Sequence, residues 1–186
     1  MLAIDTSSAR AALAVVEDDR VLGETVKPAG RDFDVAAEAA LLLADPKALE
    51  SVLVALGPGS FTGLRQGIAF GVGLALSLQV PLLGAGTLEL AAARARQPAL
   101  AVSEAGRGRV YWLAPDGRRG VAEAASLPRE WPLVGWLRKP LPELDFLPES
   151  GQRSFGEAVL ELREKAVELG YATVTPQYME DFGGLV

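Results

Sequence analysis

Two short segments carry the residue types that could do chemistry. Asp5-Thr6-Ser7-Ser8 follows a short apolar run, and a glycine-rich turn over 57–63 follows the apolar run 51–56. A carboxylate followed by hydroxyls could hold a magnesium-bound phosphate, with the carboxylate reaching the metal through water. The glycine-rich turn stands between a strand and a helix, where unpaired backbone amides suit anions. The residues of this predicted phosphate site are Asp5, Thr6, Ser7, Ser8, Gly57, Gly59 and Ser60.

Each segment also has a purely structural interpretation. Asp and Ser side chains at a strand-to-strand turn can satisfy loose backbone amides. Glycines supply positive φ in turns, and Ser60 or Thr62 can cap the helix that follows. The second segment is not a Walker P-loop, because Leu64-Arg65 stands where Lys-Ser or Lys-Thr would be needed. The residues leave the two interpretations open.

Composition excludes several kinds of chemistry. The 186 residues contain no Cys and no His, which removes disulfides, thiolate catalysis, imidazole zinc ligands and the Ser-His-Asp triad from this sequence. We therefore predict no catalytic residue and no metal site, and any metal would have to be a hard, oxygen-bound cation. The formal net charge of −6 argues against nucleic-acid binding by this chain alone.

The elements that position these segments predict a mixed α/β sheet. Three strands form antiparallel hairpins first, and parallel strands are then added through helical crossovers. The expected strands are 2–6, 11–17, 20–27, 51–56, 81–85, 99–103 and 110–114, and the expected helices are 35–44, 62–78, 87–96 and 155–169.

The segment 62–78 is apolar on almost every side, whereas an ordinary surface helix carries one apolar stripe. A glycine inside a helix costs about 1 kcal/mol relative to alanine, so the row Gly63, Gly67 and Gly71 predicts close backbone approach, either to the chain's own sheet or to a partner. Together with helix 35–44, whose interior charge is Glu38 alone, this segment predicts an interface with a second protein. The predicted interface residues are Val35, Leu42, Gly63, Arg65, Gly67, Phe70, Gly71, Leu74 and Leu78.

Membrane insertion and export are not expected from the sequence. The apolar run 67–78 is too short for the roughly 20 residues of a spanning helix, and the start of the chain lacks the pattern of a signal peptide. We expect a soluble, cytoplasmic protein.

The opening LAIDTSS and the stretch VALGPGSFTGLRQGIAFGVGLALSLQVPLLGAGTLELAA together resemble the TsaB (YeaZ) family. The resemblance extends weakly through EAGRGRVY at 104–111. It implies an α/β, actin/Hsp70/sugar-kinase-like (ribonuclease H-like) fold with two lobes and mixed sheets, the second lobe being reduced. The N-terminal lobe with the dimerisation helices would span 1–97, and the reduced C-terminal lobe would span 98–186.

The same resemblance implies a non-catalytic scaffold subunit in the synthesis of N6-threonylcarbamoyladenosine in tRNA (t6A37). In that pathway the family's partner TsaD performs the transfer, and the ATPase TsaE joins a ternary complex. The phosphate site would then be vestigial, this chain would require no cofactor, and ATP and magnesium would act at the level of the complex. Alone, the chain would form a homodimer, and it would contact tRNA only through the complex.

The chain departs from the family's pattern in three places. Arg31-Asp32-Phe33 lacks the histidine of the family's Arg-Ser-His segment. Glu104 and Gly106 replace the aspartate and the first arginine of an Asp-Ala-Arg-Arg motif. Near the end of the chain, Tyr178-Met179-Glu180 stands where Tyr-Leu-Arg is typical.

Two alternative functions remain. A small ATP-dependent phosphotransferase of the same superfamily would use Asp5 for magnesium and Ser7, Ser8 and Gly59 for phosphate, but it needs a base to activate an acceptor hydroxyl. Direct contact with tRNA phosphate is a weaker alternative, since a basic cluster is usually a solvated face. That cluster comprises Arg107, Arg109, Arg118 and Arg119.

Overall fold

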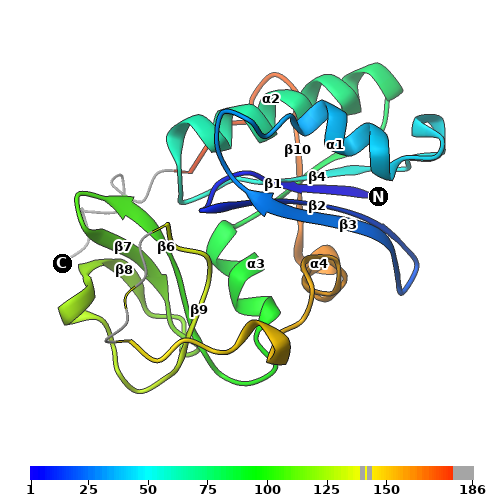
Figure 1. The fold of residues 1–186 in the computed structure, drawn as a ribbon. Coiled ribbons are helices and arrows are strands. Elements are labelled where there is room, and N and C mark those ends of the chain that lie inside the picture. Colours follow the sequence, from blue (N-terminus) through cyan, green and yellow to red (C-terminus); the bar gives the residue numbers. More distant parts are fainter. Residues whose placement is uncertain (139–140, 142–143, 178–186) are drawn as a thin grey trace.

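The computed structural model describes residues 1–138, 141 and 144–177, which form two β-sheets with helices packed on them (Figure 1). Within these residues the first sheet has six strands, in the order β10-β5-β4-β1-β2-β3. β1 lies inside the sheet, where it pairs antiparallel with β2 and parallel with β4. The strands are β1 (Leu2–Asp5), β2 (Arg10–Glu17), β3 (Arg20–Pro28), β4 (Val52–Ala55), β5 (Leu82–Ala85) and β10 (Val167–Leu169).

Helices cover both faces of this sheet (Figure 1). α1 (Val35–Leu42) and α2 (Phe61–Leu78) lie side by side on one face, and α3 (Thr87–Arg94) and α4 (Phe155–Leu162) lie on the other. With both faces covered, β1 and β4 are buried along their whole length, which explains why their sequences are continuous apolar runs. Short 3-10 turns occur at Pro46–Ala48, Ala124–Ser126, Glu149–Gly151 and Arg163–Lys165.

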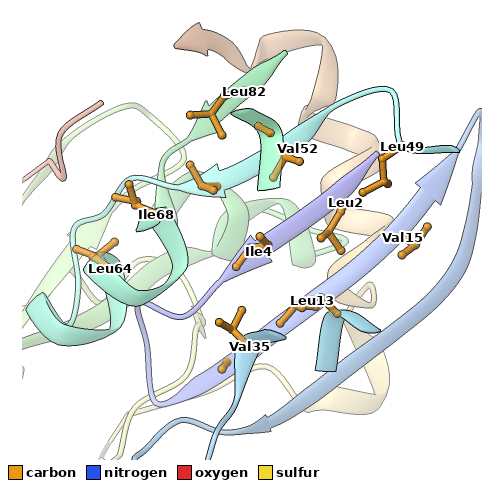
Figure 2. Close-up of a cluster of buried hydrophobic side chains, with 14 of the residues drawn as sticks. Leu2, Ile4, Leu13, Val15, Val35, Leu49, Val52, Leu64, Ile68 and Leu82 are labelled. Carbon is orange, nitrogen blue, oxygen red and sulfur yellow. The ribbon is translucent and has the colours of Figure 1, made fainter. Parts of the chain in front are cut away.

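The core between α1, α2 and the sheet is built from aliphatic side chains. Leu64 and Ile68 of α2 and Val35 of α1 point toward Leu2 and Ile4 of β1 and their neighbours (Figure 2). Ser60 is the N-cap of α2, since its side chain accepts a hydrogen bond from the Gly63 N–H. Of the two caps predicted from the sequence, Ser60 and Thr62, the structure therefore selects Ser60.

A second sheet forms the rest of the described chain. Within the described residues it has four strands, in the order β8-β7-β6-β9. They are β6 (Leu100–Gly106), β7 (Arg109–Leu113), β8 (Arg119–Glu123) and β9 (Leu133–Val134). α3 contacts β6 and β7, and Leu88 of α3 shares an apolar cluster with Ala101 and Tyr111. α3 therefore joins the first sheet to the second.

Most predicted elements are confirmed, with boundaries that move by up to three residues. The predicted helix over 155–169 is wrong in its second half. α4 ends at Leu162, and β10 then pairs antiparallel with β5 at the edge of the first sheet. The physical reason is that the backbone of Val167–Leu169 forms hydrogen bonds with the edge strand β5, and these replace the hydrogen bonds of a longer helix. β8 and β9 were also not among the predicted strands.

The chain returns to the first sheet after the second one. α4 contacts β2 and β3, and β10 extends the first sheet, although 155–169 fall in the part predicted as the C-terminal lobe. The division of the chain after residue 97 stays a prediction. The predicted departure at Tyr178-Met179-Glu180 lies outside the described residues.

Candidate functional site

The turn after β1 holds the first predicted segment, and its side chains point into the protein. The Asp5 carboxylate is only 4% exposed, and its Oδ1 accepts hydrogen bonds from the Ser7 backbone N–H at 2.8 Å and from Ser7 Oγ at 2.5 Å. Ser7 Oγ also lies 2.8 Å from Thr87 Oγ1, at the start of α3. Asp5 and Ser7 thus form a polar network under the turn.

Burial controls the charge of Asp5. Removal of the carboxyl group from water raises its pKa, because the charged form is penalised, while the hydrogen bonds from Ser7 act in the opposite direction. The hydrogen bonds from Ser7 hold the Asp5 side chain inside the turn, so the Ser7 hydroxyl is already engaged.

The glycine-rich turn packs directly on the first segment. The Ser60 N–H donates to the Ser7 carbonyl oxygen at 2.6 Å, and Thr6 Oγ1 donates to the Gly63 carbonyl oxygen at 2.6 Å. A Cβ at Gly59 would come closer than 3.0 Å to the Ser7 carbonyl oxygen, nearer than real Cβ atoms approach. Gly57 has a positive φ of 113°, which favours glycine. The close packing of these two loops and the positive φ of Gly57 therefore explain why glycine stands at positions 57 and 59.

The structure brings all seven residues of the predicted phosphate site together, but their hydroxyl groups are engaged inside the chain. Ser8 Oγ donates to the Arg10 carbonyl oxygen at 2.9 Å, and Thr6 and Ser7 are engaged as described above. This arrangement favours the structural interpretation of the turn. Phosphate binding stays a prediction.

A cleft of about 380 Å³ opens beside these loops, toward the second sheet. Arg138 is a residue of this cleft that the sequence reasoning missed, since it lies in a segment without regular structure. Its backbone N–H donates to Glu104 Oε1 at 2.6 Å, and its side chain pairs with Glu104 at 3.7 Å. The cleft is lined by Ser7, Ser8, Gly59, Ser60, Phe61, Glu104, Ala105, Gly106, Tyr111 and Arg138.

Acidic side chains do not converge here. Among residues 1–138, 141 and 144–177, no three His, Cys, Asp or Glu side chains form a group that could hold a metal ion.

The outward faces of α1 and α2 form a second candidate site, which we call the α1–α2 surface. Leu41 is 79% exposed, Leu76 is 56% exposed and Phe61 is 51% exposed. The Arg65 guanidinium lies over the Phe61 ring at 3.8 Å from its centroid. The exposed residues of the α1–α2 surface include Leu41, Phe61, Arg65, Ala69, Gly73 and Leu76.

The α1–α2 surface and the predicted interface share Arg65 but differ in their other residues. Val35, Gly67 and Gly71 are buried inside this chain, which gives no support to their assignment to an interface, and that assignment stays a prediction. A Cβ at Gly67 would come closer than 3.0 Å to Thr6 Oγ1, and one at Gly71 equally close to Val54 Cγ1, so the glycine row provides close approach to the chain's own sheet.

The other predicted interface residues divide by exposure. Gly63 faces the turn after β1, since a Cβ there would meet the Thr6 carbonyl oxygen. Arg65 is exposed, and the remaining four residues are half-buried against the core. Those four are Leu42, Phe70, Leu74 and Leu78.

α2 is long and apolar enough to cross a membrane by length and composition, the one such helix among the described residues, and 28% of it is buried. Its glycine row lies on β1 and β4, so the helix is a layer of the α/β fold. The combination of an apolar sequence and limited burial marks the exposed side of α2 as unusual for a surface helix.

Two of the four arginines of the basic cluster, Arg118 and Arg119, pair with acidic neighbours. Arg118 Nε lies 2.7 Å from Asp116 Oδ2, and Arg119 pairs with Glu89 at 3.1 Å. Such pairing is typical of a solvated face and gives no support to tRNA contact at this cluster.

Comparison with known proteins relates the chain to t6A biosynthesis proteins. A family model described as TsaD, tRNA N6-adenosine threonylcarbamoyltransferase, matches residues 20–125. The tRNA threonylcarbamoyladenosine biosynthesis protein TsaB of Bacillus subtilis (strain 168) is 34% identical over 146 residues, which cover 74% of this chain and 64% of that protein. The protein of the same name from Escherichia coli (strain K12) is 44% identical over 61 residues, covering 30% of this chain and 26% of that protein. The match therefore spans less than two thirds of the Bacillus relative.

Solved structures share the fold. YeaZ from Pseudomonas aeruginosa matches with a TM-score of 0.68 at 24% identity, over 95% of this chain and 98% of that chain. A crystal structure of an uncharacterised protein, described as similar to peptidase YeaZ from Pseudomonas aeruginosa, matches with a TM-score of 0.70 at 21% identity, over 95% of this chain and 97% of that chain. The α/β, actin/Hsp70/sugar-kinase-like fold class predicted from the sequence is confirmed.

Proposed function

Because the chain belongs to the TsaB (YeaZ) family, we propose that it is a non-catalytic scaffold subunit of t6A synthesis that binds TsaD. In this proposal TsaD performs the transfer, TsaE joins the assembly, and ATP and magnesium act at the level of the complex. The chain works in the cytoplasm and meets tRNA only through the complex.

The exposed apolar α1–α2 surface is the single observation that carries this proposal. Leu41, Phe61 and Leu76 together expose large apolar side chains on two adjacent helices. An apolar patch that a folded chain leaves open is a common sign of a protein–protein interface. Ala69 and Gly73 lie between the large residues, so a partner's helix could approach the α2 backbone closely there.

The residues of the cleft support the non-catalytic part of the proposal. Many transferases and peptidases use a Cys nucleophile, a His base or a His-bound metal, and this sequence has no Cys and no His. Asp5 and Ser7, the pair best placed by sequence, bond to each other below the turn. The phosphotransferase alternative also gains no support. Asp5, its proposed magnesium ligand, is buried and accepts a hydrogen bond from Ser7.

Charged substitutions on the α1–α2 surface test TsaD binding. Leu76→Glu and Ala69→Glu each place a carboxylate at the proposed interface, where a partner would have to desolvate it. Glutamate has good helix propensity, so α2 should still form. We expect each variant to weaken binding to TsaD by roughly 30-fold or more, measured by isothermal titration calorimetry.

Val167→Glu is the matched control. Val167 is 63% exposed on the edge strand β10, outside the α1–α2 surface, and its substitution should leave TsaD affinity unchanged. Because the homodimer would use the same surface, Leu76→Glu should also be monomeric when alone, as judged by light scattering. An unchanged dissociation constant for both helix variants, with native melting curves, would count against the proposal.

A further inference from the structure

A small enclosed cavity lies where the first sheet, α3 and the second sheet meet. Its volume is about 10 Å³, and it has polar groups from distant parts of the chain in its wall. Asp5 comes from the end of β1, Arg94 from the end of α3 and Ser103 from β6. Apolar residues such as Leu90 and Phe155 complete the wall.

Arg94 is the unusual member of this cavity, because arginine is almost never fully buried. It is 5% exposed, and its Nη2 donates to Glu149 Oε2 at 2.6 Å. Its guanidinium stacks on the Trp136 ring, 4.1 Å from the centroid, and Trp136 Nε1 donates to Glu149 Oε1 at 3.0 Å. This arrangement neutralises the charge and fixes the plane of the guanidinium.

Three polar atoms at the cavity nevertheless lack a partner. Arg94 Nε, Arg94 Nη1 and Ser103 Oγ are buried and make no hydrogen bond to any described residue. Ser103 is 1% exposed, so bulk water does not reach it. An unsatisfied buried donor costs roughly 1–3 kcal/mol, and such atoms are rare in folded proteins. Arg94 and Ser103 both line this cavity, which indicates a ligand between them.

Size and charge define that ligand. A cavity holds one water molecule once its volume reaches roughly 10–15 Å³, so a larger molecule does not fit. A simple anion would meet the Asp5 carboxylate, and a metal cation would meet Arg94. Arg94 Nε and Nη1 point to opposite edges of the guanidinium, so one small ligand can reach only one of them. Water can accept a hydrogen bond from that N–H and donate to two oxygen acceptors.

We propose that this cavity is a binding site for one resident water molecule, which accepts a hydrogen bond from one of the two free Arg94 donors, Nε or Nη1, and donates to the Asp5 carboxylate and Ser103 Oγ. The water links β1 of the first sheet to β6 of the second through α3. It is therefore a structural ligand of the junction between the two sheets, independent of the proposed binding of TsaD.

A crystal structure of the wild-type chain, at a resolution that reveals ordered water, tests the site directly. The expected result is one water peak within hydrogen-bond distance of Arg94 Nε or Nη1 and of Ser103 Oγ. The proposal is overturned if the cavity contains no density, or if these atoms find partners within the protein.

An isosteric pair of variants tests the same site in solution. Ser103→Thr and Ser103→Val have equal shapes, so any strain from the added methyl group is common to both. The hydroxyl retained in Ser103→Thr should keep the hydrogen bond from the water to residue 103. We expect the Tm of Ser103→Thr to exceed that of Ser103→Val by about 2–4 °C. An equal or higher Tm for Ser103→Val would indicate a dry cavity and overturn the proposal.

Discussion

Asp5 illustrates how a residue with catalytic potential can have a structural role. Its spacing to Ser7 and Ser8 suits a phosphate site, and the same spacing lets Ser7 donate two hydrogen bonds back to the carboxylate. The sequence could not decide between these roles. The deciding contacts come from Thr87, which is 80 residues away from Ser7, and from Gly63, which is 57 residues away from Thr6.

The raised pKa of Asp5 predicts a pH dependence of stability. In the unfolded chain an Asp carboxyl titrates near about 3.9, whereas burial raises the pKa in the folded chain. Between these two values the folded state holds a proton that the unfolded state has released, so the stability from this group falls as pH rises. Asp5→Asn removes the titration, and its free energy of unfolding relative to wild type should increase from pH 4 to pH 7.

Urea unfolding of the two proteins across this pH range measures the difference. A difference that does not change with pH would contradict the assigned burial of the carboxyl group.

The glycines of α2 divide into two sets that the sequence does not distinguish. Gly71 faces β4, and a Cβ there would collide with Val54, whereas Gly73 has no atom within 4 Å of an added Cβ. Both lie in the same helix, so the difference comes from which face meets the sheet.

This division predicts opposite effects of the same substitution. Gly73→Ala should stabilise the chain by about 0.5–1 kcal/mol, because alanine has the better helix propensity at an unhindered position. Gly71→Ala should destabilise it by about 1–3 kcal/mol through overpacking. Chemical denaturation measures both, and equal effects from the two variants would show that the assigned helix face is wrong.

At the scale of elements, apolar pattern predicted which segments form helices and strands but did not orient α2. Three of its rows are apolar or small, so periodicity alone leaves three candidate faces. Close approach of Gly67 and Gly71 to the sheet selects one of these faces, and it gives no support to the prediction that places both glycines at a partner interface.

The segment after α4 shows a second limit of local pattern. Residues 155–169 contain enough apolar residues for a continuous helix, yet the chain leaves the helix at Leu162 and pairs as β10 with β5. Strand pairing of this kind depends on a partner more than 80 residues earlier in the sequence. Local sequence pattern therefore cannot identify the strand with which 167–169 pair.

Tyr171 connects the segment that follows β10 to the end of α2 through a hydrogen bond. Its Oη donates to the Val80 carbonyl oxygen at 2.6 Å, just beyond the end of α2. Tyr171→Phe keeps the ring and removes this bond, so we expect a loss of about 0.5–1.5 kcal/mol in the free energy of unfolding. Urea titration with an unchanged m-value would check this, and an unaltered midpoint would contradict the structural role of the hydroxyl.

At the scale of the whole molecule, family resemblance predicted the fold class, and the comparisons confirm it. The arrangement of the two sheets was harder to predict from the sequence, because the chain leaves the first sheet through α3 and returns to it through α4 and β10. The Arg94–Glu149 pair at their junction also escaped prediction, since its members are 55 residues apart and no motif marks them.

The central claim is that this chain supports t6A synthesis by binding TsaD through the α1–α2 surface. The most direct measurement is t6A formation on tRNA by purified TsaD and its other partners while this chain is titrated in. We predict that product appears only with the wild-type chain or Val167→Glu, saturates near a one-to-one ratio to TsaD, and falls at least tenfold with Leu76→Glu. Equal product without this chain, or full activity with Leu76→Glu, would contradict the claim.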